Sequence, residues 1–163
     1  MPGSWRLMRN SDMQDVSRIA AIVHPDFPED DAIFAERLEL APEGCFILEL
    51  EGEACGYMFS HPWLDSDIPP LNTLLGKLPA SPQTWYLHDI ALMPQARSRG
   101  QTSPIIRHLF SIGQAADLPT VSLVAVNGSQ GFWQHMGFED VSSEKLKEKL
   151  LSYDDAARYM VHR

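Results

Sequence analysis

Residues 87–102 have the sequence Leu-His-Asp-Ile-Ala-Leu-Met-Pro-Gln-Ala-Arg-Ser-Arg-Gly-Gln-Thr, in which an apolar run is followed by a basic loop. An apolar, aromatic-rich run over residues 85–92 predicts a buried central strand. A proline-marked turn and a basic loop containing Gly100 follow, and then apolar residues recur at helical spacing until Pro119. Such a strand, loop and helix direct main-chain N–H groups and the positive end of the helix dipole at one point, which suits a phosphate group.

The charge of this loop contrasts with that of the chain. Arg97 and Arg99 lie in the loop, whereas the net charge of the whole sequence is −9. Two arginines on a solvated turn would give the same pattern, so the loop alone leaves both interpretations open.

A second segment has the same organisation. A buried strand over residues 121–126 leads to a turn at Asn127, a short helix over residues 129–136 and a stop at Gly137. We expect this strand to lie beside the strand over residues 85–92. Two strand-to-helix turns would then open at the same edge of one sheet.

The other predicted elements complete a single domain over residues 1–163. They are a strand from Trp5, helices over 11–23 and 31–41, strands over 45–51 and 54–61, a helical insert over 145–151 and a strand over 158–162. Residues 63–82 are rich in proline and predict an irregular connection, of a length that commonly covers a site. The predicted order is β-α-α-β-β-β-α-β-α-β, an α/β (α+β) fold with one mixed sheet and helices on both faces.

Composition narrows the class of protein. Hydrophobic residues make up 44% and charged residues 21% of the sequence, which is ordinary for a globular domain. No apolar run approaches the roughly 20 residues that span a bilayer, and the N-terminus lacks the apolar core of a secretion signal. Cys45 and Cys55 lie in apolar segments without metal-ligand spacing, which favours buried thiols over a disulfide. We therefore expect a cytoplasmic protein with no membrane partner and no metal.

The acidic balance disfavours nucleic acid as a partner, because binding phosphates requires Lys or Arg. It weakly favours a cationic small molecule or a basic peptide, although acidity also serves solubility. Asp26, Glu29, Asp30 and Asp31 form an acidic loop that would either attract such a cation or remain solvated.

Taken together, the two segments resemble the GNAT N-acetyltransferase superfamily. The family has Arg/Gln-x-x-Gly-x-Gly/Ala after an apolar strand and a proline, and Arg97-x-x-Gly100-x-Thr102 matches this motif. Further on, the family has Asn at a strand end, an aromatic pair and Gly-Phe, matched by Asn127, Phe132-Trp133 and Gly137-Phe138. The order of elements agrees over nearly the whole chain, so the resemblance implies a GNAT-like acyl-CoA N-acyltransferase fold.

The resemblance implies an acetyltransferase that uses acetyl-CoA as cosubstrate and a primary amine of a small molecule or peptide as acceptor. The amine would attack the acetyl carbonyl directly, and the resemblance also allows a homodimer. The implied cofactor-binding residues are Ile90, Ala91 and Leu92 beside the pantetheine arm, Arg97, Ser98, Arg99, Gly100, Gln101, Thr102 and Ser103 around the pyrophosphate, and Asn127 and Trp133 at the second turn.

The sequence departs from the family pattern in this loop. Thr102 stands where the family prefers Gly or Ala, and Ser98 and Gln101 replace a common glycine and an apolar residue. Pro104 removes one N–H group that could bind phosphate. We expect these changes to lower the affinity for CoA without abolishing it.

The catalytic candidates are three residues of the central strand, Tyr86, His88 and Asp89. Family members often place a carboxylate here to deprotonate the amine, so either Asp89 or His88 is the expected base. Because the two are adjacent in a strand, we expect them to face opposite sides of the sheet. A core histidine and a structurally paired aspartate are the alternatives.

The residue that would protonate the leaving thiolate has several candidates. Trp133 stands where many members carry a tyrosine, and an indole cannot donate a proton near neutral pH, so we expect it to serve as a packing residue. Protonation of the thiolate would then come from Tyr86 or water, or the thiolate would leave unaided. A domain that binds acyl-CoA as a sensor, without turnover, is the alternative function, and an interaction protein with an empty cleft is a third.

Overall fold

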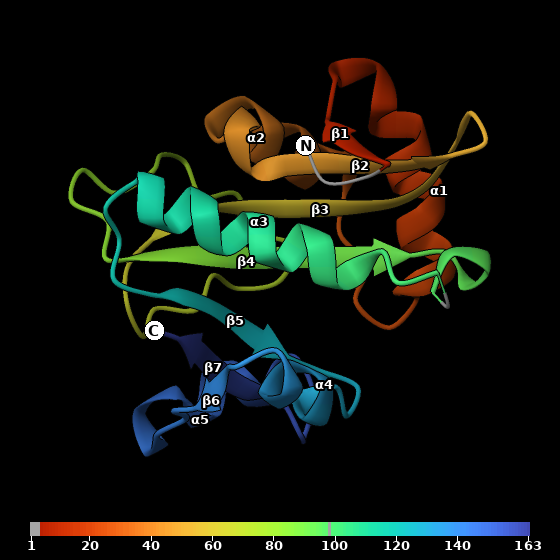
Figure 1. Cartoon of the computed structure of the whole chain (residues 1–163). Coiled ribbons are helices and arrows are strands. Elements are labelled where there is room, and N and C mark those ends of the chain that lie inside the picture. Colours follow the sequence, from red (N-terminus) through yellow and green to blue (C-terminus); the bar gives the residue numbers. More distant parts are fainter. Residues whose placement is uncertain (1–3, 98) are drawn as a thin grey trace.

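The computed structural model describes residues 4–97 and 99–163, which form a seven-stranded mixed sheet in the order β1-β2-β3-β4-β5-β7-β6 (Figure 1). The strands are β1 (Trp5–Leu7), β2 (Cys45–Leu50), β3 (Glu53–Trp63), β4 (Thr84–Leu92), β5 (Val121–Ala125), β6 (Glu139–Asp140) and β7 (Arg158–His162). All neighbouring pairs are antiparallel except β4 and β5, which are parallel.

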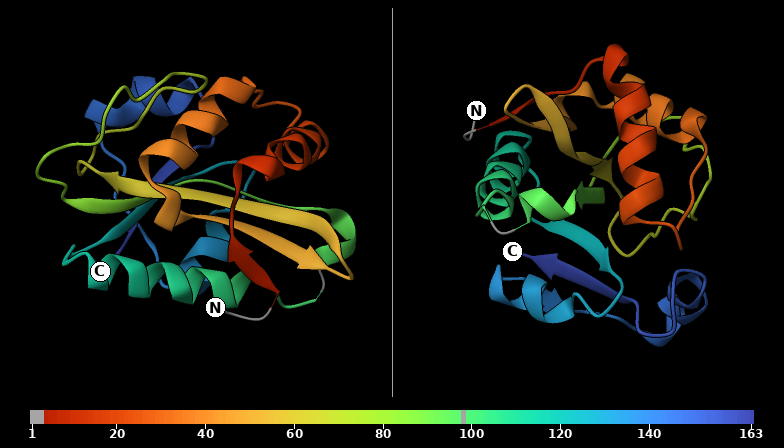
Figure 2. Two further views of the ribbon diagram at one scale, coloured as in Figure 1. Left: turned by 90° about the horizontal axis from the view of Figure 1, so that it is seen from above. Right: turned by 90° about the vertical axis from the view of Figure 1, so that its right-hand side faces the viewer.

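Helices cover both faces of the sheet (Figure 2). They are α1 (Met13–Val23), α2 (Asp31–Leu40), α3 (Thr102–Ala115), α4 (Gln130–His135) and α5 (Lys147–Leu151). One face is covered by α1, α2 and α5, and the opposite face by α3 and α4, as their separate apolar clusters show. The predicted mixed sheet with helices on both faces is therefore confirmed.

The apolar periodicity explains which side of each helix is buried. In α3, the residues at helical spacing, Ile105, Ile106 and Leu109, are fully buried against the sheet. In α1, Val16 and Ile19 occupy the equivalent positions against the other face. The structure also contains a two-residue strand, β6, that the sequence pattern does not predict, because its two residues are acidic and exposed.

Residues 64–83 connect β3 to β4 without helix or strand, as predicted from their prolines. We call this segment the strap. It crosses the face that carries α2 and α5 and is held there by hydrogen bonds to both neighbouring regions. Glu36 of α2 accepts from Leu75 N and Gly76 N, and the Tyr153 hydroxyl donates to Pro69 O.

Candidate functional site

The parallel strands β4 and β5 separate partway along their length. They pair only at three positions, from Trp85 with Val121 to Leu87 with Leu123, although β4 continues to Leu92. Beyond Leu87 a cavity of about 250 Å³ lies between the strands and α4. We call this cavity the strand cleft. It lies at the edge of the sheet where the sequence predicts two strand-to-helix turns to open.

A β-bulge at His88 lies where the strands separate. Phe59 of β3 pairs with Asp89 and Ser60 pairs with Leu87, so His88 is the additional residue in β4. A bulge bends its strand and increases the local twist. This bend carries the second half of β4 away from β5 and so contributes to the strand cleft.

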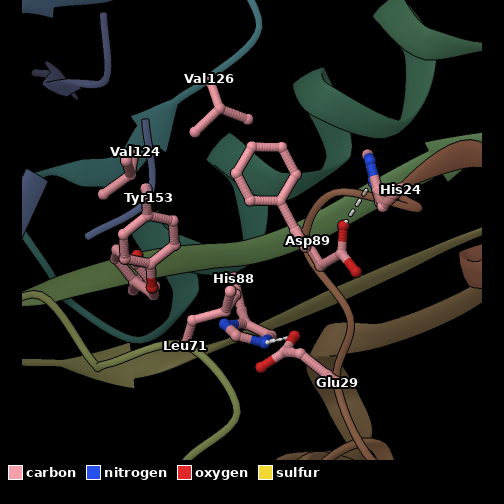
Figure 3. Close-up of a pocket in the computed structure, with 10 residues that line it drawn as sticks. His24, Glu29, Leu71, His88, Asp89, Val124, Val126 and Tyr153 are labelled. Carbon is pink, nitrogen blue, oxygen red and sulfur yellow. Dashed lines mark hydrogen bonds and ion pairs between the residues drawn. The ribbon is translucent and has the colours of Figure 1, made fainter. Parts of the chain in front are cut away.

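The bulge also overturns one expectation from the sequence. His88 and Asp89 were expected on opposite sides of the sheet, but both side chains line the same pocket (Figure 3). The strict alternation of a strand fails here because the additional residue shifts the pattern by one position. The two catalytic candidates therefore lie on the face that carries α1 and α2.

Asp89 is held by two side chains from other elements. The Tyr57 hydroxyl of β3 donates to Asp89 Oδ2 at 2.6 Å, and His24 Nε2 lies 3.0 Å from Asp89 Oδ1. Burial would raise the pKa of Asp89, but the hydrogen bond and charge of His24, with the Tyr57 bond, hold this pKa below its ordinary value. Asp89 is therefore an ionised carboxylate beside an imidazole, and we call these two residues the dyad.

The hydrogen bonds of His24 fix its tautomer. Its Nε2 also lies 3.0 Å from Ile90 O, and since a carbonyl and a carboxylate only accept, Nε2 carries the hydrogen. Nδ1 is then the atom that can take or release a proton. Burial alone would lower the pKa of His24, but the hydrogen bond and charge of Asp89 outweigh it and raise this pKa above its ordinary value.

Sequence reasoning missed His24 and Glu29 as site residues. His24 appears in the sequence only as the end of a helix before Pro25, and its partner lies 65 positions further along the chain. Glu29 belongs to the acidic loop, yet its side chain is 4% exposed and accepts from His88 Nε2 at 2.9 Å. Burial would raise the pKa of Glu29, but its interactions with His88 hold it below the ordinary value.

The loop after β4 contains most of the predicted cofactor residues. Gly100 has φ +67°, a left-handed conformation, and a Cβ at this position would meet no atom within 4 Å among the described residues other than its chain neighbours. Thr102 and Ser103 open α3, where first-turn N–H groups have no carbonyl acceptor within the helix. Gln101 makes no capping bond through its side chain, while its carbonyl accepts from Trp5 Nε1.

The other cofactor candidates in this loop include two arginines, Arg97 and Arg99. The Arg97 side chain turns back to β4, where its Nε donates to Leu92 O at 3.1 Å. Arg99 and Gly100 are exposed. The prediction for Ser98 falls outside the described residues.

The edge of β4 that faces the strand cleft carries the carbonyls of Ile90 and Leu92, which accept from His24 and Arg97. Ile90 lines the cleft, whereas Ala91 packs into the apolar cluster of the α1 and α2 face. Across the cleft, Asn127 has φ +55° and its N–H donates to Asp154. Asn127 is exposed and lines the strand cleft.

Comparison with known proteins assigns the family. The sequence model of the acetyltransferase (GNAT) family matches residues 8–138. The chain is a member of the GNAT family. No match is found among the curated proteins.

Solved GNAT structures share the fold of this chain. The GphF GNAT-like decarboxylase in complex with isobutyryl-CoA has a TM-score of 0.82 at 16% identity, with 98% of each chain covered. Naa20 of Chaetomium thermophilum in complex with a bisubstrate analogue has a TM-score of 0.73 at 17% identity, covering 98% of this chain and 86% of that one. The ribosomal-protein-S18-alanine N-acetyltransferase of Escherichia coli has a TM-score of 0.67 at 15% identity, covering 99% and 93%.

Two aromatic candidates of this GNAT protein have distinct positions. Trp133 is 7% exposed and packs edge-on against Phe132 and Phe138, and it also lines the strand cleft. Tyr86 is 1% exposed and lies on the other side of β4, toward α5. Burial raises the pKa of Tyr86 well above its ordinary value, which makes its hydroxyl a weaker acid than a solvated phenol.

Other expectations concern cysteine, metals and membranes. Cys45 and Cys55 are free and buried, as predicted. Within residues 4–97 and 99–163, no group of three or more His, Cys, Asp or Glu side chains is arranged to hold a metal ion. In the same residues, no helix has the length and apolar character needed to cross a bilayer.

His61 makes the stability of this fold depend on pH. It is fully buried behind His88, with ring centroids 6.4 Å apart, and burial lowers the pKa of His61 to about 3. In the unfolded chain His61 takes up a proton as the pH falls through 6.5, whereas in the folded protein it stays neutral down to about pH 3. The contribution of neutral His61 to the free energy of unfolding is therefore complete above pH 6.5 and is lost as the pH falls below it. We expect the free energy of unfolding to fall by roughly 1.4 kcal/mol per pH unit as acidity increases below about pH 6.

The free energy of unfolding can be measured by urea unfolding of the wild type and of His61→Phe, between pH 7 and about pH 4. Phenylalanine keeps the ring packing against Trp63 and Tyr86 but cannot titrate, so its stability should depend less on pH. Equal pH slopes in both proteins would show that His61 is not the source.

Proposed function

We propose that this GNAT protein is an acetyl-CoA-dependent N-acetyltransferase that moves an acetyl group to a primary amine by direct attack. The observation that carries the proposal is the separation of β4 from β5, which leaves a cavity of about 250 Å³ between them. The dyad of His24 and Asp89 borders this cavity. An acyl group carried into the strand cleft would therefore lie next to a group able to exchange protons.

The residues around the strand cleft fit an acyl-CoA. Main-chain groups of Ile90 and Leu92 face the cleft side of β4 and could pair with the amides of a pantetheine arm. The first-turn N–H groups of Thr102 and Ser103, with the positive end of the α3 dipole, could hold the pyrophosphate. In this proposal the Arg97 guanidinium leaves Leu92 O and moves to the phosphates.

The dyad supplies the proton transfer that the reaction needs. An amine arrives as an ammonium ion, and His24 Nδ1 takes a proton from it so that its nitrogen can attack the acetyl carbonyl. The new N–C bond forms as the C–S bond breaks. The acylated nitrogen then releases its second proton to water, and the thiolate takes a proton from water or from the imidazolium. Asp89 orients the ring through Nε2 and stabilises its charged form.

The two carboxylates also distinguish this reaction from a decarboxylation. Asp89 and Glu29 both have lowered pKa values and both border the pocket beside the dyad. Like charges would repel an acyl group that carries its own carboxylate, whereas they attract an ammonium ion. The electrostatics of the site therefore favour an amine acceptor, although the similar GphF structure is a GNAT-like decarboxylase.

Calorimetry with acetyl-CoA, followed by detection of free thiol with a panel of amines, tests the proposal. We expect saturable binding and thiol release that depends on the amine. Binding without thiol release across a broad panel would instead indicate a sensor. An absence of binding would indicate a domain that has kept only the fold.

A further inference from the structure

A second cavity adjoins the strand cleft at the dyad. It has a volume of about 50 Å³, and we call it the dyad pocket. The two cavities share His24, His88, Asp89, Val124 and Val126, so they meet where the acceptor nitrogen would have to lie. Figure 3 shows these five side chains around the pocket, together with Leu71 of the strap.

The wall of the dyad pocket is mainly apolar. Its apolar and aromatic members are Phe27, Leu71, Tyr86, Val124, Val126 and Tyr153. The charged groups are confined to the side of the dyad and of Glu29, whose carboxylate is 4% exposed. A ligand in this pocket therefore meets negative charge at one end and hydrocarbon at the other.

The strap forms one wall of the dyad pocket through Leu71. Its neighbour Asn72 makes three hydrogen bonds to the α1–α2 connection. The Asn72 N–H donates to Glu29 Oε2 at 3.0 Å, Asn72 Nδ2 donates to Asp30 Oδ2 at 3.5 Å, and Asn72 Oδ1 accepts from Asp30 N at 2.7 Å. On the other side, Tyr153 donates to Pro69 O. A ligand chain that extended past the dyad toward Leu71 would meet this hydrogen-bonded segment.

The volume limits what the pocket can hold. One water occupies roughly 10–15 Å³ by the same kind of measure, so about 50 Å³ holds a group of about four heavy atoms. A branched alkyl group has this size, whereas a peptide strand does not. The nearby carboxylates of Asp89 and Glu29 disfavour an acceptor that bears its own carboxylate, such as a free amino acid.

We propose that the acceptor is a small primary amine whose only charge is its ammonium group and whose remainder is a compact branched hydrocarbon, of the class of isobutylamine. This inference depends on the proposed acetyltransferase function and adds the substrate class to it. Leu71 of the strap is then a specificity-determining residue, because it sets the depth of the pocket without bonding to the dyad.

The test compares isobutylamine, leucine, a leucyl dipeptide and spermidine as acceptors with acetyl-CoA, by free thiol release. We expect kcat/KM for isobutylamine to exceed that for each of the others by at least about 10-fold. A dipeptide or leucine that is acetylated as well as isobutylamine would overturn the inference. So would acetyl-CoA binding without acetylation of isobutylamine.

A pair of strap variants tests the pocket directly. Leu71→Trp should fill it and lower kcat/KM for isobutylamine by at least about 10-fold, with the affinity for acetyl-CoA within about twofold of wild type. Leu74→Trp is the matched control, because Leu74 lies in the same strap but is 56% exposed, and it should leave both values unchanged.

The readouts separate the two proposals. Equal activity of Leu71→Trp and wild type would overturn the substrate class while leaving the acetyltransferase function in place. Failure of the wild type to bind acetyl-CoA in calorimetry would overturn both.

Discussion

Replacement of His24 by alanine should lower kcat for acetyl transfer by about 10²–10⁴-fold, the usual contribution of a positioned general base. The affinity for acetyl-CoA should stay close to wild type, because His24 lines the strand cleft but does not belong to the loop after β4 that would bind the pyrophosphate. Steady-state thiol release gives kcat, and calorimetry gives the affinity. Asp89→Asn should cause a similar loss, and the double variant little more, because the dyad acts as one unit.

The control for this prediction is His135→Ala, since His135 is an exposed histidine of α4. It should have wild-type kcat. Wild-type kcat in His24→Ala would contradict the role of the dyad. A loss of kcat with an equal loss of acetyl-CoA affinity would indicate a structural role instead.

The same residue should set the pH dependence of the reaction. Because the pKa of His24 is raised, its neutral form predominates only above the ordinary imidazole value of 6.5. In the wild type, kcat/KM should therefore rise with pH as His24 loses its proton above pH 6.5. This rise should be separate from the one caused by deprotonation of an alkylamine substrate at about pH 10. The limb of the imidazole should be missing in His24→Ala.

Replacement of Gly100 by tryptophan should weaken acetyl-CoA binding by at least about 100-fold, which is about 2.7 kcal/mol. The residues that the structure describes leave space open around Gly100, so an indole there would extend into the region in front of the first turn of α3. The left-handed backbone at φ +67° adds a conformational cost of about 1 kcal/mol to the folded state. Calorimetry measures the affinity, and thermal unfolding measures the cost.

Gly76→Trp provides a matched control for this cost. Gly76 has φ +80° and equally open surroundings, but it lies in the strap, at the opposite end of β4 from the loop after Leu92. This variant should lose similar stability and keep its affinity for acetyl-CoA. Unchanged affinity in Gly100→Trp would refute the placement of the pyrophosphate.

The sequence was sufficient for the frame of this site. The apolar run that forms β4, the turn at Pro94 and the periodicity of α3 are local patterns, and each predicts its element without reference to the rest of the chain. The placement of β5 beside β4 is confirmed as well. This placement followed from the shared strand, turn and helix organisation of the two segments.

The chemistry of the site depended on contacts that local patterns do not contain. The bulge at His88 arises from the register between β3 and β4, and the pairing of His24 and Glu29 with β4 joins residues about 60 positions apart. The role of Tyr57 could not be predicted from the sequence either, because its hydrogen bond to Asp89 depends on its place opposite β4. The strap was predicted as an irregular connection, but the residues that hold it could not be predicted from its prolines.

A crystal structure of the protein with acetyl-CoA would show whether the cosubstrate binds between β4 and β5. We predict electron density for the pantetheine arm between β4 and β5, beside Ile90 and Leu92, with the pyrophosphate at residues 100–103 and the thioester next to the dyad. Density for the nucleotide at another surface, with β4 and β5 unchanged and the strand cleft filled by protein side chains, would contradict the claim.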